Sequence, residues 1–303
     1  MSETSLQITQ AGDINLSSRI KTIAIVDRTL VDKKQKLRNA LEGMVSGENI
    51  RQDKQAEQEV ISGLNNMLRS SPRFQVKMTN IQLAGSWTGS VFPVPLDTME
   101  INSICRQYGA DAVAALETFD SDCSGRLVII KLGFRLYDRV NNSITDQYLY
   151  NYRLKWKRSH VRSTYQGISN SFNERVAINQ ASYQAGENYG KRIAPTNLTV
   201  KRSFFISGDA TLATGSRKAQ IGDWKGAAEI WEQVLNNPSP KIAGMAAYNL
   251  ALASEMTGDL KQAQIWISRA SAGYKNKEVI KYGLLINQRL IEQQKLEQQM
   301  KVE

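Results

Sequence analysis

The stretch at 222–227, GDWKGA, returns 36 residues later as GDLKQA at 258–263. Glycine at such a point permits a tight reversal of the chain, and the aspartate after it caps the next helix. An echo with a period of 20 to 50 residues is typical of stacked helical hairpins, which bury their apolar faces only against one another. We therefore predict an all-α domain of helical repeats over 207–303, closed by a capping helix at 278–299 that is polar on its outer side.

The first two-thirds of the chain follow a different pattern. Short β-branched strands alternate with helices, which favours a small, mainly parallel sheet. Two longer strands around the turn signal NNS at 141–143 then predict an antiparallel hairpin that extends this sheet. The fold class is thus an α/β (α+β) domain over 1–206 followed by the helical repeats. The predicted strands are 20–26, 73–79, 110–116, 126–137 and 147–157, with 198–206 able to supply one more before the helical repeats. The predicted helices are 60–68, 98–108 and 172–192.

Composition excludes several classes of protein. Hydrophobic residues make up 41% and charged residues 22%, as in globular proteins and unlike disordered ones. No run of 18 apolar residues exists, so we expect no transmembrane helix. Residues 1–10 lack the basic start and apolar block of a secretory signal, which predicts a cytosolic protein or a processed form of an exported one. We expect Cys105 and Cys123 to be free thiols.

The net charge of +10 is concentrated between 125 and 206, which holds 14 Lys and Arg against 4 Asp and Glu. Alternation along the hairpin predicts one outward basic patch, with the interleaved tyrosines on the opposite, buried face. Such a patch could meet an anionic lipid surface, an acidic envelope polymer or nucleic acid, or it could be only a solvated sheet face. The predicted patch comprises Lys131, Arg135, Arg153, Lys155 and Lys157.

The helical repeats predict a partner-binding groove. Its predicted lining comprises Tyr248, Asn249, Leu252, Ser216 and Gln220. The Asn249 amide could hydrogen-bond the backbone of an extended peptide, although Tyr248 could equally pack between helices.

No catalytic, cofactor-binding or metal-binding residue is predicted. His160 is the single histidine and has no partner at metal-ligand spacing. Glu117, Asp120 and Asp122 follow a predicted strand, where ligands often bind in parallel sheets, but three acids are also ordinary loop residues. Phosphate-binding glycine loops and nucleophile elbows are missing from the sequence. We therefore expect no enzyme and no cofactor.

The stretch AYNLA at 247–251, followed by GDL at 258–260 and by Ala263 and Ala270, resembles a tetratricopeptide repeat. The copy around 222 keeps the turn but lacks the Tyr-Asn-Leu start. This resemblance covers the last third of the chain and implies a concave face that binds a peptide or a protein.

Residues 20–116 are similar to the N-terminal α/β domains of bacterial envelope proteins of the TolB and curli-secretion lipoprotein groups. The resemblance rests on the strand at 23–26, SPRF at 71–74 and GAD at 109–111. It implies the fold of this part of the chain and a place in the cell envelope.

Four longer phrases, at 11–16, 116–120, 135–138 and 185–195, resemble a family of uncharacterised lipoproteins of the Bacteroidetes type. That family carries the same C-terminal repeats and has no established activity. The resemblance implies a protein on the periplasmic side of the envelope, lipid-anchored in its precursor, with the cytoplasm as the alternative.

These observations predict a non-enzymatic cell-envelope protein that binds or scaffolds another protein through its helical repeats. The alternative is a cytosolic nucleic-acid-binding protein that uses the basic hairpin 126–158.

Overall fold

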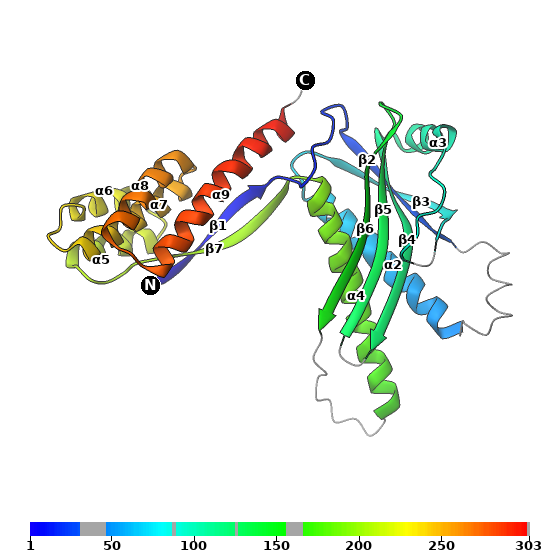
Figure 1. The fold of residues 1–303 in the computed structure, drawn as a ribbon, viewed down its shortest axis with the longest axis horizontal. Coiled ribbons are helices and arrows are strands. Elements are labelled where there is room, and N and C mark those ends of the chain that lie inside the picture. Colours follow the sequence, from blue (N-terminus) through cyan, green and yellow to red (C-terminus); the bar gives the residue numbers. More distant parts are fainter. Residues whose placement is uncertain (31–46, 87–88, 125–126, 156–165, 302–303) are drawn as a thin grey trace. The chain divides into compact units, whose positions relative to one another are not determined.

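A computed structural model describes residues 1–30, 47–86, 89–124, 127–155 and 166–301 (Figure 1). The chain divides into two compact units. The α/β unit comprises Gly12–Thr196 and Gln299–Glu303, and the helical unit comprises Met1–Ala11 and Asn197–Gln298. The predicted fold class, an α/β part followed by an all-helical part, is confirmed. The division differs from the predicted boundary after residue 206, because both 1–11 and 197–206 belong with the helices.

The α/β unit is built on a five-stranded sheet in the order β3-β2-β4-β5-β6. β2 pairs in parallel with β3 and β4, and the long β4-β5-β6 meander is antiparallel. The sequence therefore predicted both the parallel part and the antiparallel extension. The strands are β2 (Thr22–Leu30), β3 (Gln75–Ala84), β4 (Ala112–Ser124), β5 (Leu127–Asp138) and β6 (Ser143–Lys155).

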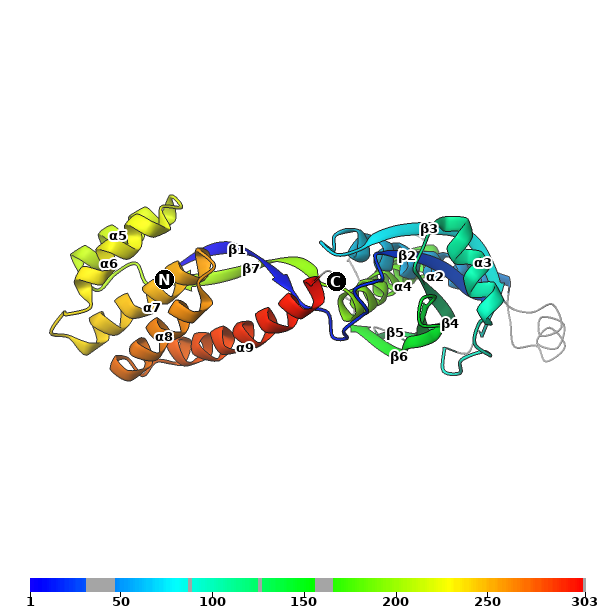
Figure 2. The ribbon, with the colours of Figure 1, turned by 90° about the horizontal axis from the view of Figure 1, so that it is seen from above.

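Helices cover both faces of this sheet (Figures 1 and 2). α2 (Gly47–Arg69) and α4 (Gln166–Ile193) pack on one face, where the main core forms. α3 (Thr98–Tyr108) packs on the other face against a smaller core. Alternating residues of the buried strands β2 and β4 contribute to the two cores in turn, as the period of a strand requires.

The helical unit contains α5 (Ala210–Gln220), α6 (Trp224–Val234), α7 (Pro240–Met256), α8 (Leu260–Gly273) and the greater part of α9 (Lys277–Met300). The two Gly-Asp turns are confirmed in detail. Gly222 and Gly258 adopt φ of 86° and 87°, a left-handed conformation that glycine adopts without strain. Asp223 and Asp259 then accept from the backbone N–H three residues on, capping α6 and α8.

Two strands that flank the α/β unit in sequence belong to the helical unit. β1 (Ser2–Gln10), which the sequence did not predict, forms a two-stranded sheet with β7 (Thr196–Phe204). Gln7 donates to Thr199 and Thr9 donates to Asn197, each at 2.8 Å. Pairing over some 190 positions of sequence explains why residues 1–11 and 197–206 group together.

Cys105 and Cys123 are both free, as predicted. No helix among the described residues has the length and apolar character needed to cross a bilayer.

Candidate functional site

The predicted groove residues lie on two helices of the helical unit. Ser216 of α5 and Tyr248, Asn249 and Leu252 of α7 are all buried, whereas Gln220 at the end of α5 is exposed. Asn249 and Leu252 have no exposed surface. The structure brings three of these five side chains, Ser216, Tyr248 and Asn249, together around a segment of the same chain.

That segment is centred on Phe205, directly after β7. The Asn249 side chain accepts from the Phe205 N–H and donates to the Phe205 carbonyl, each at 2.8 Å. The Ser216 hydroxyl lies 2.8 Å from the same carbonyl. The Phe205 ring packs edge-on against Tyr248 and Tyr274, with ring centroids 5.1 and 6.0 Å apart. Asn249 thus holds an extended backbone as predicted, but that backbone is internal.

The prediction of an open groove at these residues is therefore wrong. A partner peptide would have to displace Phe205, and the freed N–H and carbonyl would lose their hydrogen bonds in a buried place. The alternative for Tyr248, packing within the core, is the one observed.

A charged cluster that the sequence did not predict lies beside Phe205. Arg202 of β7 donates to both oxygens of Glu255 on α7 at 2.8 Å, and Arg289 of α9 donates to the same carboxylate at 2.5 Å. The Tyr282 hydroxyl adds a fourth hydrogen bond at 2.7 Å. We call Glu255, Arg202, Arg289 and Tyr282 the Glu255 cluster. It joins β7, α7 and α9.

Burial and partners shift the pKa values in this cluster in opposite directions. Burial alone would raise the pKa of Glu255, but its hydrogen bonds with Arg202 and Tyr282 and the nearby positive charge lower that pKa below its ordinary value. Burial raises the pKa of Tyr282 well above its ordinary value, and the Glu255 charge raises it further. The carboxylate is therefore held charged and the phenol neutral, which suits a structural role.

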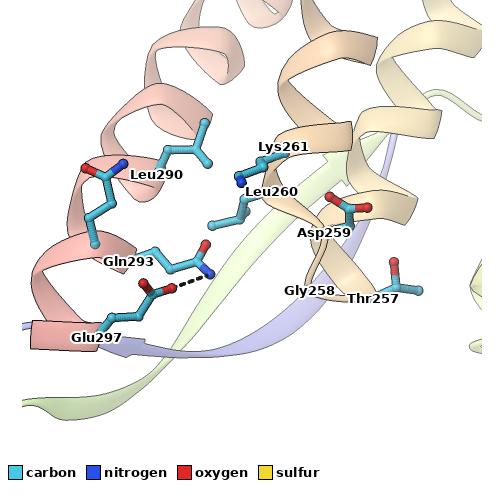
Figure 3. A pocket seen from close by; sticks show the side chains of 9 residues that line it. Thr257, Gly258, Asp259, Leu260, Lys261, Leu290, Gln293 and Glu297 are labelled. Carbon is cyan, nitrogen blue, oxygen red and sulfur yellow. Dashed lines mark hydrogen bonds between the residues drawn. The ribbon is translucent and has the colours of Figure 1, made fainter. Parts of the chain in front are cut away.

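A hollow of about 460 Å³ lies between the α7–α8 turn at 257–261 and the second half of α9 (Figure 3). Its α9 side is formed by Leu290, Gln293, Gln294 and Glu297. The Gln293 amide donates to Glu297 at 3.3 Å. The two amides, the two carboxylates, the Lys261 ammonium and the Thr257 hydroxyl of the lining offer hydrogen bonds to a polar polypeptide.

The outer side of α9 is less polar than predicted. Ile280, Leu284 and Ile291 are 55%, 68% and 70% exposed, and Asn287 between them is also exposed. We call Ile280, Leu284, Asn287 and Ile291 the α9 outer stripe. The prediction of a polar outer face is wrong along this stripe.

In the α/β unit, the strand register places the predicted basic residues on one sheet face. Lys131 lies opposite Asn151, and Arg153 and Lys155 lie opposite Ile129 and Leu127. The predicted burial of the tyrosines on the other face is confirmed, since Tyr148, Tyr150 and Tyr152 pack against the main core. Lys157 and His160 lie outside the described residues.

The patch is smaller than predicted, because Arg135 is buried. Lys131 is ion-paired with Asp120 at 3.3 Å. Only Arg153 and Lys155 are freely exposed among the predicted patch residues that the structure describes. Two exposed charges form a weak footprint for a polyanion, since binding to a phosphate backbone strengthens with each neutralised charge.

Arg135 is buried because it pairs with Glu117, which has no exposed surface. Arg135 and Arg28 donate to one Glu117 oxygen at 2.8 and 2.9 Å, and the Tyr137 hydroxyl donates to the other at 2.5 Å. We call these four residues the Glu117 cluster. Burial and the bond to Glu117 raise the pKa of Tyr137 to about 12.

The Glu117 cluster holds the loop that precedes α3. Arg135 donates to the Pro93 carbonyl at 2.7 Å, and Arg28 donates to the Val94 carbonyl at 2.6 Å. The Phe92 ring lies under the Arg135 guanidinium, 4.5 Å away. Glu117 is thus enclosed by protein and engaged on both oxygens. The acidic residues at 117, 120 and 122 do not gather with other ligands, and the described residues contain no cluster suited to a metal ion.

Two protein-family models together match most of the chain. The family model described as Domain of unknown function (DUF8603) matches residues 20–205, so the chain belongs to this family. A second model, Domain of unknown function (DUF6340), matches residues 213–300 in the helical unit. The resemblances to tetratricopeptide repeats and to Bacteroidetes-type lipoproteins stay predictions. No curated protein matches the chain.

Several solved structures are similar to part of the chain. The PelC dodecamer from Paraburkholderia phytofirmans is 11% identical, with a TM-score of 0.27, and the match covers 61% of this chain and 97% of that one. TolB from Acinetobacter baumannii is 14% identical with a TM-score of 0.24, covering 57% and 31%. A hypothetical protein from Chlamydia trachomatis is 12% identical with a TM-score of 0.30, covering 56% and 96%. TM-scores this low establish neither a shared fold nor a shared function.

Proposed function

We propose that this member of the DUF8603 family is a non-enzymatic cell-envelope protein that binds another protein through the α9 outer stripe of its helical unit. The observation that carries the proposal is the exposure of Ile280, Leu284 and Ile291 on the last helix of a helical stack. The envelope location rests on the sequence resemblance alone.

The end of a helical stack is normally polar, because its outer face meets water. On α9 the inner side is packed by Val279, Tyr282 and Ile286, which are buried in the helical core. The outer stripe on the other side exposes large aliphatic side chains instead. Burying each such side chain contributes about 1.5–3 kcal/mol, so a partner that covers all three gains several kcal/mol.

The spacing of the stripe residues indicates which kind of secondary structure in the partner packs against them. Ile280, Leu284, Asn287 and Ile291 are 4, 3 and 4 residues apart, the alternation of a heptad seam. An amphipathic helix with matching spacing is the segment that packs best along such a seam. A single asparagine among apolar seam positions favours one register over others. We therefore propose an amphipathic helix of a different protein as the occupant.

This binding mode replaces the predicted inner groove, which Phe205 fills. It leaves the helical core unchanged on binding, because the stripe residues do not contribute to that core. The hollow beside Gln293 and Glu297 lies along the same helix and offers polar contacts to a longer partner.

Photo-cross-linking in the native cell tests the proposal. A benzoyl-phenylalanine side chain replaces Leu284 or Ile291 in the full chain, and Ile221 serves as the matched control. Ile221 is 82% exposed but stands at the end of α5, away from α9. We expect one discrete adduct with a different protein from positions 284 and 291, and none from 221.

The same adduct should disappear when Ile280→Lys is added to the position-291 probe, because a charge in the seam opposes burial. Equal labelling from all three positions, no adduct, or an adduct only between two copies of this chain would contradict the proposal.

A further inference from the structure

β6 forms one edge of the five-stranded sheet and pairs only with β5 among the described strands. No backbone hydrogen bond from residues 143–155 reaches any other described segment. Every second residue of an edge strand points its N–H and carbonyl away from the sheet. β6 therefore presents a row of such groups along thirteen residues, about twice the length of an ordinary strand.

β6 carries few of the features that usually protect an edge. It contains no proline, and its register with β5 runs unbroken from Lys155 opposite Leu127 to Asp146 opposite Leu136. One register shift follows, between Leu136 and Tyr137, and the charged Arg153 and Lys155 lie at the other end of the strand. Its outward side chains include the half-exposed Leu149. A long, regular and partly apolar edge is a template for pairing with another strand.

The opposite edge of the same sheet provides a comparison. The pairing of β3 with β2 shifts register twice, between Ile25 and Asp27 and between Asp27 and Leu30. Such irregularities bend a strand and interrupt its outer row of hydrogen-bonding groups. The β3 edge is thus irregular in two places, whereas the β6 edge is regular from Asp146 to Lys155, so β6 is the edge better suited to pairing.

We propose that β6 pairs antiparallel with β6 of a second copy of this chain, joining two sheets into one. A two-fold axis relates two identical edges in this way and satisfies the same groups on both copies. The proposal does not depend on the α9 outer stripe, which belongs to the other unit.

Charge and apolar complementarity favour the second copy as the occupant. Overlap of the regular stretch 146–152 with its copy places the axis at Leu149, which then faces Leu149 of the second copy. In this register Tyr148 faces the second copy's Tyr150, and Gln147 faces its Asn151. Asp146 faces its Tyr152. No two like charges stand opposite one another within 146–152, and the leucines meet on one face of the joined sheet while the tyrosines meet on the other.

Sedimentation of the full chain over about 1–100 µM tests this pairing. We expect the wild type to form a dimer. Leu149→Lys places two positive charges face to face at the axis, so it should raise the dimer dissociation constant by at least about tenfold. Leu149→Glu should do the same with two negative charges.

An equimolar mixture of the Leu149→Lys and Leu149→Glu chains should restore the dimer, because opposite charges then face each other at the axis. This rescue is specific to a register in which residue 149 pairs with itself. Val140→Lys is the matched control, since Val140 is 46% exposed like Leu149 but lies in the β5–β6 turn. It should leave the dimer unchanged.

A wild type that stays monomeric would overturn the proposal. Dimers of unchanged stability in both Leu149 variants, or a mixture that stays monomeric, would also overturn it. Leu284→Lys in the α9 outer stripe should not alter the dimer, so failure of the proposed partner binding and failure of this inference can be told apart.

Discussion

Two buried glutamates, one in each unit, are held by the same set of partners. Glu117 in the α/β unit and Glu255 in the helical unit each accept hydrogen bonds from two arginines and one tyrosine. A lone buried carboxylate is strongly disfavoured, and each cluster avoids this cost by enclosing the charge in donors. The same chemistry therefore stabilises a sheet in one place and a helical stack in the other.

The clusters differ in what they connect. Partners of Glu117 come from β2 and β5, which lie beside β4 in one sheet, and the arginines also fix the loop at 93–94. Partners of Glu255 come from β7, 53 residues before it, and from α9, 27 and 34 residues after it. The strands around Glu117 are already joined by the backbone hydrogen bonds of the sheet, so they do not depend on the cluster for their pairing. The Glu255 cluster, by contrast, is itself a main link between β7 and the helices. We therefore expect the helical unit to depend more on its cluster.

The largest effect should follow Glu255→Gln. The buried Arg202 and the half-buried Arg289 then lose their negative partner, and breaking a buried ion pair in this way costs about 3–5 kcal/mol. Denaturant unfolding followed by fluorescence measures it, since Trp224, Trp231 and Trp266 all lie in the helical unit. Glu297→Gln on exposed α9 surface is the control and should change stability by less than about 0.5 kcal/mol.

Glu117→Gln makes the corresponding change in the α/β unit. We expect it to lower the free energy of unfolding by less than Glu255→Gln does under the same conditions, because the sheet hydrogen bonds of β4 persist. An equal or larger loss would contradict the view that the two clusters differ in importance.

Acid should reproduce part of the Glu255→Gln effect. The pKa of Glu255 is lowered in the folded protein, so its stabilisation is complete above the unfolded pKa of about 4.3 and is lost as pH falls below it. Unfolding free energies measured between pH 6 and pH 3 should fall less steeply for Glu255→Gln than for the wild type. Parallel curves would show that Glu255 does not contribute.

Asn249→Ala should cost about 1–3 kcal/mol, because the buried Phe205 N–H loses its side-chain partner and the Phe205 carbonyl keeps only the Ser216 hydroxyl. Asn236→Ala, at an exposed position after α6, is the control, and thermal unfolding measures both variants. If Asn249→Ala unfolds like its control, Phe205 is not held as the structure indicates.

Ser216→Ala should have the smallest effect, about 1 kcal/mol or less, since the Asn249 amide still donates to the Phe205 carbonyl. Measured with Asn249→Ala in a double-mutant cycle, the two losses should not add, because both side chains bind one carbonyl. Strict additivity would contradict this shared contact.

Local patterns alone determined much of this protein. The repeated Gly-Asp turns, the alternation of tyrosines with basic residues along 147–155 and the capped helix at 98–108 were readable because turns, caps and strand periods depend on neighbouring residues. The 4-3-4 spacing of the α9 outer stripe is also a local pattern, but the sequence analysis predicted a polar outer side, and only the structure shows that this side of the helix exposes aliphatic residues.

Only the tertiary structure decided the fate of the predicted site. Arg135 was assigned to the surface by its strand period, but Glu117 and the loop at 93–94 enclose it. Phe205 fills the predicted groove, and β1 joins the helical unit by pairing with β7. Each of these contacts joins residues that are distant in sequence. Their strength comes from burial and from partners that no local pattern specifies, so sequence predicted the elements better than it predicted which surfaces stay open.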